Sequence, residues 1–110
     1  MRIGNCFEDA GRRATDPFND ENWTLVHGLP FNPAIGMRMP HGWLEKDEIV
    51  LDTNSGKMID KGLYYAMGKI EDTVRYTKAE ARKMIVDTGH WGHWDEMFHE
   101  TEALLEGLGY

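Results

Sequence analysis

Helix-forming patterns lie towards the two ends of this sequence, and strand-forming patterns fill the middle. Residues 5–14, 77–88 and 95–106 carry apolar side chains at helical spacing. The strand-like segments are "WTLVHGLPF" (23–31), a strand that Pro30 ends, "MRMPHGWLE" (37–45), "EIVLD" (48–52) and "DTVRY" (72–76), with turn-forming stretches between them. This order predicts an α+β fold, in which an N-terminal helix, a mainly antiparallel sheet and C-terminal helices form one domain over residues 1–110.

Capping signals mark two of the expected helix starts. Asn5 followed by Glu8 predicts a helix that begins at Cys6, and "TKAE" at 77–80 is a capping box for a helix that Gly89 ends. Residues 60–70 fit two structures, a short helix capped by Asp60 or a strand that contains two tyrosines.

Composition excludes several classes of function. Twelve basic and nineteen acidic residues give a formal charge of -7, which argues against a nucleic-acid partner. No apolar run approaches the ~20 residues that span a bilayer, and residues 1–13 have acids where an export signal would be apolar, so no membrane partner is expected. A single cysteine cannot form an internal disulfide, which is typical of a reducing cytoplasm.

Cys6 has two interpretations. A lone cysteine in such a protein is commonly a small buried residue on the packing face of its helix. At a helix start, however, the dipole and a nearby imidazolium would favour the thiolate, which is the nucleophilic form.

A hairpin supplies the partners that a thiolate would need. If Lys46 and Asp47 form a two-residue loop, His41 faces Asp52 across the strands, and a three-residue loop would place Thr53 there instead. Thiol catalysis needs a base and a group that fixes the tautomer of that base. Cys6, His41 and Asp52 are therefore the candidate nucleophile, base and orienting group.

Three further residues are candidates for the substrate pocket. Asn5 could support an oxyanion together with backbone amides, although capping the helix is its other role. His27 could line the pocket or only pack beside it, and we favour packing. Trp43 lies on the face of His41 in a regular strand and would shield one side of the site.

The order of these residues resembles that of the papain-like cysteine hydrolases, which include the transglutaminase core and the NlpC-type peptidases. The likeness covers roughly residues 4–53. It implies a papain-like core in which a thiolate–imidazolium pair attacks an amide or ester carbonyl through an acyl-enzyme.

A wider resemblance rests on "GNCFEDAGR", "LVHG", "HGWLE" with Asp52 after it, "YTKAEAR" and "GHWGHWD". These segments are similar to small proteins found in bacteriophage genomes, which bring no established activity. The resemblance implies a phage or phage-derived setting and, for a phage protein, the host cytoplasm.

The segment "GHWGHWDEMFHE" is a weaker candidate for a metal site. His90 and His93 have H-x-x-H spacing, and Asp95 and His99 lie four apart on one helix face. The alternative is a tight connection in which tryptophans fill the core, and no H-E-x-x-H or paired C-x-x-C motif is present.

The sequence therefore predicts a cysteine hydrolase or acyl-transfer enzyme that needs no cofactor and acts on a peptide or small amide. The rival hypotheses are a non-enzymatic phage accessory or binding protein and a His-rich metal-binding module. So small a core with four tryptophans could also bury one face in a homodimer.

Overall fold

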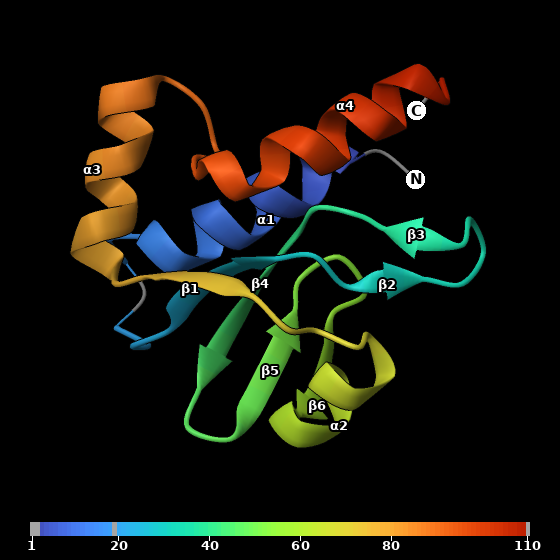
Figure 1. The fold of residues 1–110 in the computed structure, drawn as a ribbon. Helices are drawn as coiled ribbons and strands as arrows, with labels where there is room; N and C mark the ends of the chain where they lie inside the picture. Colours follow the sequence, from blue (N-terminus) through green and yellow to red (C-terminus); the bar gives the residue numbers. More distant parts are fainter. Residues whose placement is uncertain (1–2, 19, 110) are drawn as a thin grey trace.

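A five-stranded antiparallel sheet forms the centre of the part of the chain that the structure describes. The computed structural model describes residues 3–18 and 20–109, with side chains of the first helix described from Cys6 onward. The sheet has the order β6-β5-β4-β1-β7. Its strands are β1 (Thr24–Gly28), β4 (His41–Lys46), β5 (Ile49–Asp52), β6 (Lys57–Asp60) and β7 (Thr73–Tyr76). A separate small hairpin, β2 (Phe31–Asn32) and β3 (Met37–Arg38), projects beside the sheet (Figure 1).

Helices cover the two faces of this sheet. The helices are α1 (Ile3–Thr15), α2 (Lys61–Met67), α3 (Lys78–Thr88) and α4 (His99–Gly107), and a 3-10 turn, η1 (Glu96–Phe98), leads into α4. The α+β prediction is therefore confirmed, with an N-terminal helix, an antiparallel sheet and C-terminal helices (Figure 1). No helix among the described residues is long and apolar enough to cross a bilayer.

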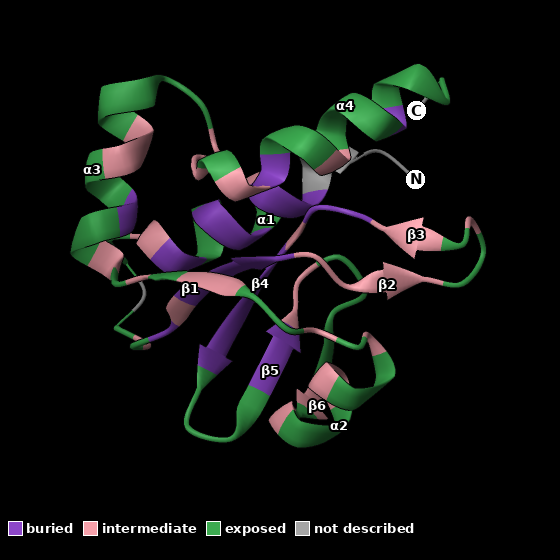
Figure 2. Ribbon diagram, viewed as in Figure 1, coloured by how far each residue is buried: buried purple, intermediate pink, exposed green. Residues whose placement is uncertain are grey.

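Period-two alternation along the central strands divides the core in two. On one face, alanines of α1 and α3 pack on Leu25, Leu44 and Leu51. On the other face, Val26, Trp43 and Val50 pack with tyrosines of α2. Buried positions accordingly concentrate in α1, β1, β4 and β5 (Figure 2).

Several predicted boundaries are confirmed and others are wrong. Thr77 and Glu80 form the expected capping box of α3, and Gly89 ends that helix in the left-handed region with φ 76°. Residues 61–67 are helical, because the Asp60 carboxylate accepts a hydrogen bond from the amide of Leu63 at 3.0 Å.

The first helix begins earlier than predicted. Its first residue is Ile3, so Asn5 lies inside the helix and is not its cap, and Cys6 is its fourth residue. The strand predicted to end at Pro30 does so, since β1 ends at Gly28. The predicted strand at 37–45 is instead divided into β3 and β4 at Pro40, which has no N–H to give to a ladder.

The predicted hairpin register is wrong by two residues. Leu44 pairs with Leu51 and Lys46 with Ile49, so the loop is Asp47–Glu48 rather than Lys46–Asp47. Asp47 adopts φ 55°, the left-handed conformation that a two-residue turn demands. Because side chains alternate with a period of two, this shift leaves His41 and Asp52 on one face, now as diagonal neighbours.

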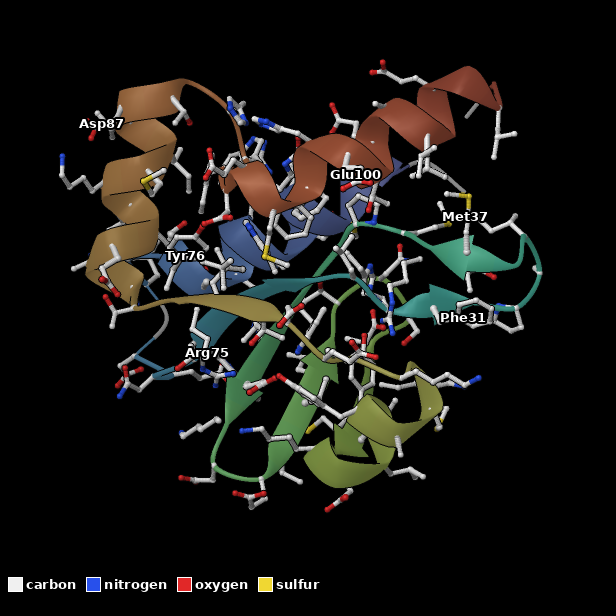
Figure 3. The ribbon with its side chains drawn as sticks, viewed as in Figure 1. Phe31, Met37, Arg75, Tyr76, Asp87 and Glu100 are labelled. Atoms are coloured by element: carbon white, nitrogen blue, oxygen red, sulfur yellow. The ribbon has the colours of Figure 1, made fainter. Side chains whose placement is uncertain are left out.

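The same register places Glu45 in the interior, where it holds several elements together. The carboxylate is 1% exposed and accepts hydrogen bonds from Trp43 Nε1 at 2.8 Å and Tyr65 OH at 2.5 Å. Arg75 of β7 (Figure 3) donates to it at 2.7 Å, and Lys61 Nζ lies 3.4 Å away. Burial alone would raise the pKa of Glu45, but the hydrogen bonds from Tyr65, Trp43 and Arg75 outweigh it and lower that pKa.

We expect Glu45→Ala to lower the free energy of unfolding by about 2–4 kcal/mol, because it leaves the buried Trp43 N–H and the Tyr65 hydroxyl without their acceptor. Urea unfolding followed by tryptophan fluorescence measures the change. The matched control is Lys83→Ala, which removes an exposed ion pair with Asp87 and should leave the free energy of unfolding nearly unchanged. Equal effects of the two variants would contradict a central role for Glu45.

Candidate active site

Helix α1 approaches strand β4 closely at Gly42. A Cβ atom on Gly42 would lie 3.2 Å from Phe7 Cδ1 and 3.6 Å from Phe7 Cα, so a larger residue would push the helix away. Cys6 precedes Phe7, and His41 precedes Gly42. The contact between Phe7 and Gly42 thus brings the start of α1 to the start of β4.

His41 lies between Cys6 and Asp52. Its Nε2 is 3.3 Å from Asp52 Oδ2. Burial lowers the pKa of His41, but hydrogen bonds to Asp52 and Cys6, together with the electrostatic interaction with each group, outweigh it and raise the pKa to about 9. The structure therefore brings the three sequence-predicted side chains together from α1, β4 and β5.

Asp52 is held by more than the imidazole. Its Oδ2 accepts a hydrogen bond from Tyr64 OH at 3.0 Å, and its Oδ1 accepts one from the amide of Asn54 at 3.0 Å. Burial would raise the pKa of Asp52, but the hydrogen bond and charge of His41 and the hydrogen bond from Tyr64 lower it. Asp52 thus contacts His41 and also organises the turn that follows.

Tyr64 is a residue of the candidate site that the sequence did not reveal. It lies on α2, and burial followed by the charge of Asp52 raises the pKa of its hydroxyl. The hydroxyl therefore keeps its proton and donates a hydrogen bond to the carboxylate. Only the correct assignment of residues 60–70 as a helix could have pointed to it.

Trp43 occupies the position expected of a shield. Its ring stacks on His41 with centroids 5.9 Å apart and planes at 29°, and it is fully buried. The side chain of Asn5 lies outside the described residues, so its predicted role at an oxyanion remains a prediction.

His27 packs on the opposite face of the sheet. It pairs with Gly42, and its ring meets Phe7 at 4.8 Å and Trp94 at 5.0 Å between centroids. Burial, followed by the charges of His93 and His41, lowers its pKa to about 3, so the ring is neutral at pH 7. Neither ring nitrogen has a hydrogen-bond partner among the described residues. The packing role that we favoured agrees with this position.

Three of the four weak candidates for metal ligands make separate hydrogen bonds. His93 Nε2 pairs with Glu102, Asp95 accepts from the amide of Met97 at 2.9 Å, and His90 Nδ1 accepts from the amide of Gly92 at 3.2 Å. Among residues 3–18 and 20–109, no three or more His, Cys, Asp or Glu side chains are arranged to hold a metal ion. His99 therefore belongs to no such group. The structure gives the metal-binding hypothesis no support.

An open cleft of about 230 Å³ reaches the site from outside. His41 and Asp52 form part of its lining. Cys6 is 3% exposed and does not line the cleft, so a substrate would meet the imidazole before the sulfur.

We expect Gly42→Ala to cost about 1–3 kcal/mol of stability and to lower the pKa of His41, because the new methyl group meets Phe7 and moves Cys6 away. Chemical unfolding and an NMR titration of the imidazole measure the two effects. In the control, Gly107→Ala, the added methyl group has nothing within 4 Å and should change neither quantity. An unchanged His41 pKa in Gly42→Ala would show that this approach does not position Cys6.

The imidazole of His41 should titrate at about 9 in the folded protein, against 6.5 for an ordinary histidine. Because the folded-state pKa is raised, its contribution to stability is complete below about 6.5 and is lost as the pH rises through about 9. Asp52→Asn removes the carboxylate charge and should bring the pKa back towards 6.5, whereas Asp87→Asn, at an exposed site, should not. NMR of the ring protons measures this directly, and a wild-type value near 6.5 would refute the assignment.

Comparison with known proteins supplies no family for this chain. No protein-family model, no curated protein and no solved structure matches it. Its function must therefore be inferred from the side chains of the site.

Proposed function

We propose that this protein is a cysteine hydrolase or acyl-transfer enzyme that acts on an amide bond through Cys6, His41 and Asp52. The observation that carries the proposal is the position of His41, which makes hydrogen bonds to both Cys6 and Asp52. A buried imidazole whose pKa is raised to about 9 holds its proton at neutral pH, as the partner of a thiolate must.

The three side chains have distinct roles in this reaction. The Cys6 sulfur attacks the carbonyl carbon, and His41 gives its proton to the leaving amine, so that a thioester forms and the C–N bond breaks. His41 then takes a proton from water, or from an acceptor amine in acyl transfer, and the thioester is cleaved as the thiolate leaves. Asp52 keeps the imidazole in one orientation and stabilises its charged form.

The arrangement of the elements supports a papain-like core. The cysteine lies at the start of a helix that packs on an antiparallel sheet, and the histidine and aspartate lie on adjacent strands. Their order along the chain is the order in the papain-like hydrolases, which the sequence resembles.

A second candidate is a non-enzymatic phage accessory or binding protein in which the same side chains are structural. The burial of Cys6 favours it, since a residue 3% exposed contributes to packing whether or not it reacts. Access to the sulfur distinguishes the two candidates.

Alkylation by iodoacetamide tests the proposal, because the chain has one cysteine and mass spectrometry reports its modification without ambiguity. If the thiolate is paired with imidazolium, the folded protein should react at pH 6–7, and His41→Ala should slow the reaction at least about ten-fold. The exposed His90 provides the control, and His90→Ala should react like the wild type.

Circular dichroism of each variant establishes that it is folded under the assay conditions. A rate that rises only above pH ~8.5, as for an ordinary thiol, would count against the thiolate pair. Reaction only after unfolding would identify Cys6 as a packing residue and favour the second candidate.

A further inference from the structure

We propose that the cleft beside His41 binds the acyl part of the substrate and selects a short, uncharged, apolar acyl group. This inference rests on the proposed function and names the chemical class of its substrate. It is drawn from the walls, the size and the charge of the cleft.

The wall of the cleft that faces His41 is apolar. It consists of Pro30, Phe31, Pro33, Met39 and Pro40, which come from the β2–β3 hairpin and the segments that flank it. Figure 3 marks Phe31 and Met37 on the two strands of this hairpin, and of the two only Phe31 lines the cleft. An apolar group bound here is transferred from water to a surface of proline rings, an aromatic ring and a thioether.

Hydrogen bonds fix this wall in place without a ligand. The amide of Phe31 donates to Gly68 O at 2.7 Å, and the amide of Met39 donates to Pro30 O at 3.0 Å. The side chain of Asn32 reaches Met39 Sδ at 3.3 Å. A wall that is already ordered loses little conformational entropy on binding, so the apolar contact contributes most of its free energy to affinity.

The volume of the cleft is below the usual range for a drug-sized ligand. Its volume is about 230 Å³, whereas pockets for such ligands have roughly 300–1,000 Å³. One side chain or a short acyl chain fits, with its carbonyl beside His41.

The charges of the lining exclude an acidic acyl group. Asp52 is the one acidic residue in the lining, and His41 and Tyr64 already use its Oδ2. Among the described residues of the lining there is no lysine or arginine that could pair with a second carboxylate, and His41 already pairs with Asp52. A charged group placed here would lose its hydration without gaining a partner.

Binding of simple amides to Cys6→Ala tests the inference without turnover. Titration with hexanamide, followed by NMR of the backbone amides, should shift Phe31, Met39 and Asn54 and give an affinity about ten-fold above that for acetamide. Succinamate, which carries a carboxylate, should give no saturable shift. Equal binding of succinamate and hexanamide, or shifts that leave out these residues, would overturn the proposal.

The hairpin offers a matched pair of variants. Phe31→Ala removes part of the wall and should weaken hexanamide binding about five-fold. Met37→Ala changes the same hairpin outside the cleft. When it is added to Cys6→Ala, the double variant should bind hexanamide as tightly as Cys6→Ala does. The NMR spectrum of each variant also reports whether it is folded.

Hydrolysis of p-nitrophenyl esters by the wild type separates this inference from the proposed function. Hydrolysis that depends on Cys6 and is faster for the hexanoate than for the acetate supports both. Dependence on Cys6 without any preference overturns the cleft proposal alone. The absence of Cys6-dependent hydrolysis, with hexanamide still bound at the cleft, overturns the enzyme and leaves an apolar binding site.

Discussion

The approach of α1 to β4 at Gly42 is the contact on which the site depends. A helix packed on a sheet is normally kept away by the side chains of both elements, and here strand β4 contributes no side chain at the crossing. The ring of Phe7 fills this space, and the neighbouring Cys6 reaches His41, the first residue of β4. Helix α1 covers one face of the sheet and the His41 side chain points to the other face. Cys6 can still reach His41, because both residues lie at the edge where β4 begins.

Strand β4 also organises the opposite side of the sheet. Its alternation directs His41, Trp43 and Glu45 to one face, where α2 covers them. Tyr65 of this helix donates to Glu45, and the preceding residue, Tyr64, donates to Asp52. The buried carboxylate of Glu45 therefore anchors α2, the helix whose Tyr64 holds Asp52. The same group of hydrogen bonds thus supports both the stability of the fold and the geometry of the site.

Local signals in the sequence were sufficient for the order of the main elements, and they pointed to three side chains that the structure brings together. The capping box at Thr77 and the strand end at Pro30 depend on a few neighbouring residues, which is why such features can be predicted without a structure. The pairing of His41 with Asp52 survived an error in register, since a shift of two residues preserves the face of a strand. Tyr64 and the roles of Gly42 and Glu45 were missed because each depends on contacts between distant segments, which no spacing along the chain encodes.

Burial of the thiol has two opposing effects on the chemistry proposed for it. A low dielectric strengthens the attraction between a thiolate and an imidazolium, and it also raises the cost of removing both ions from water. Asp52 shifts this balance, because it adds a second negative charge beside His41 and is itself held by Tyr64. With the sulfur ionised, the three groups carry a net charge of one negative unit in a protein whose formal charge is already -7. The same electrostatics that would hold the proton on His41 therefore favour neutral substrates over anionic ones, independently of the shape of the cleft.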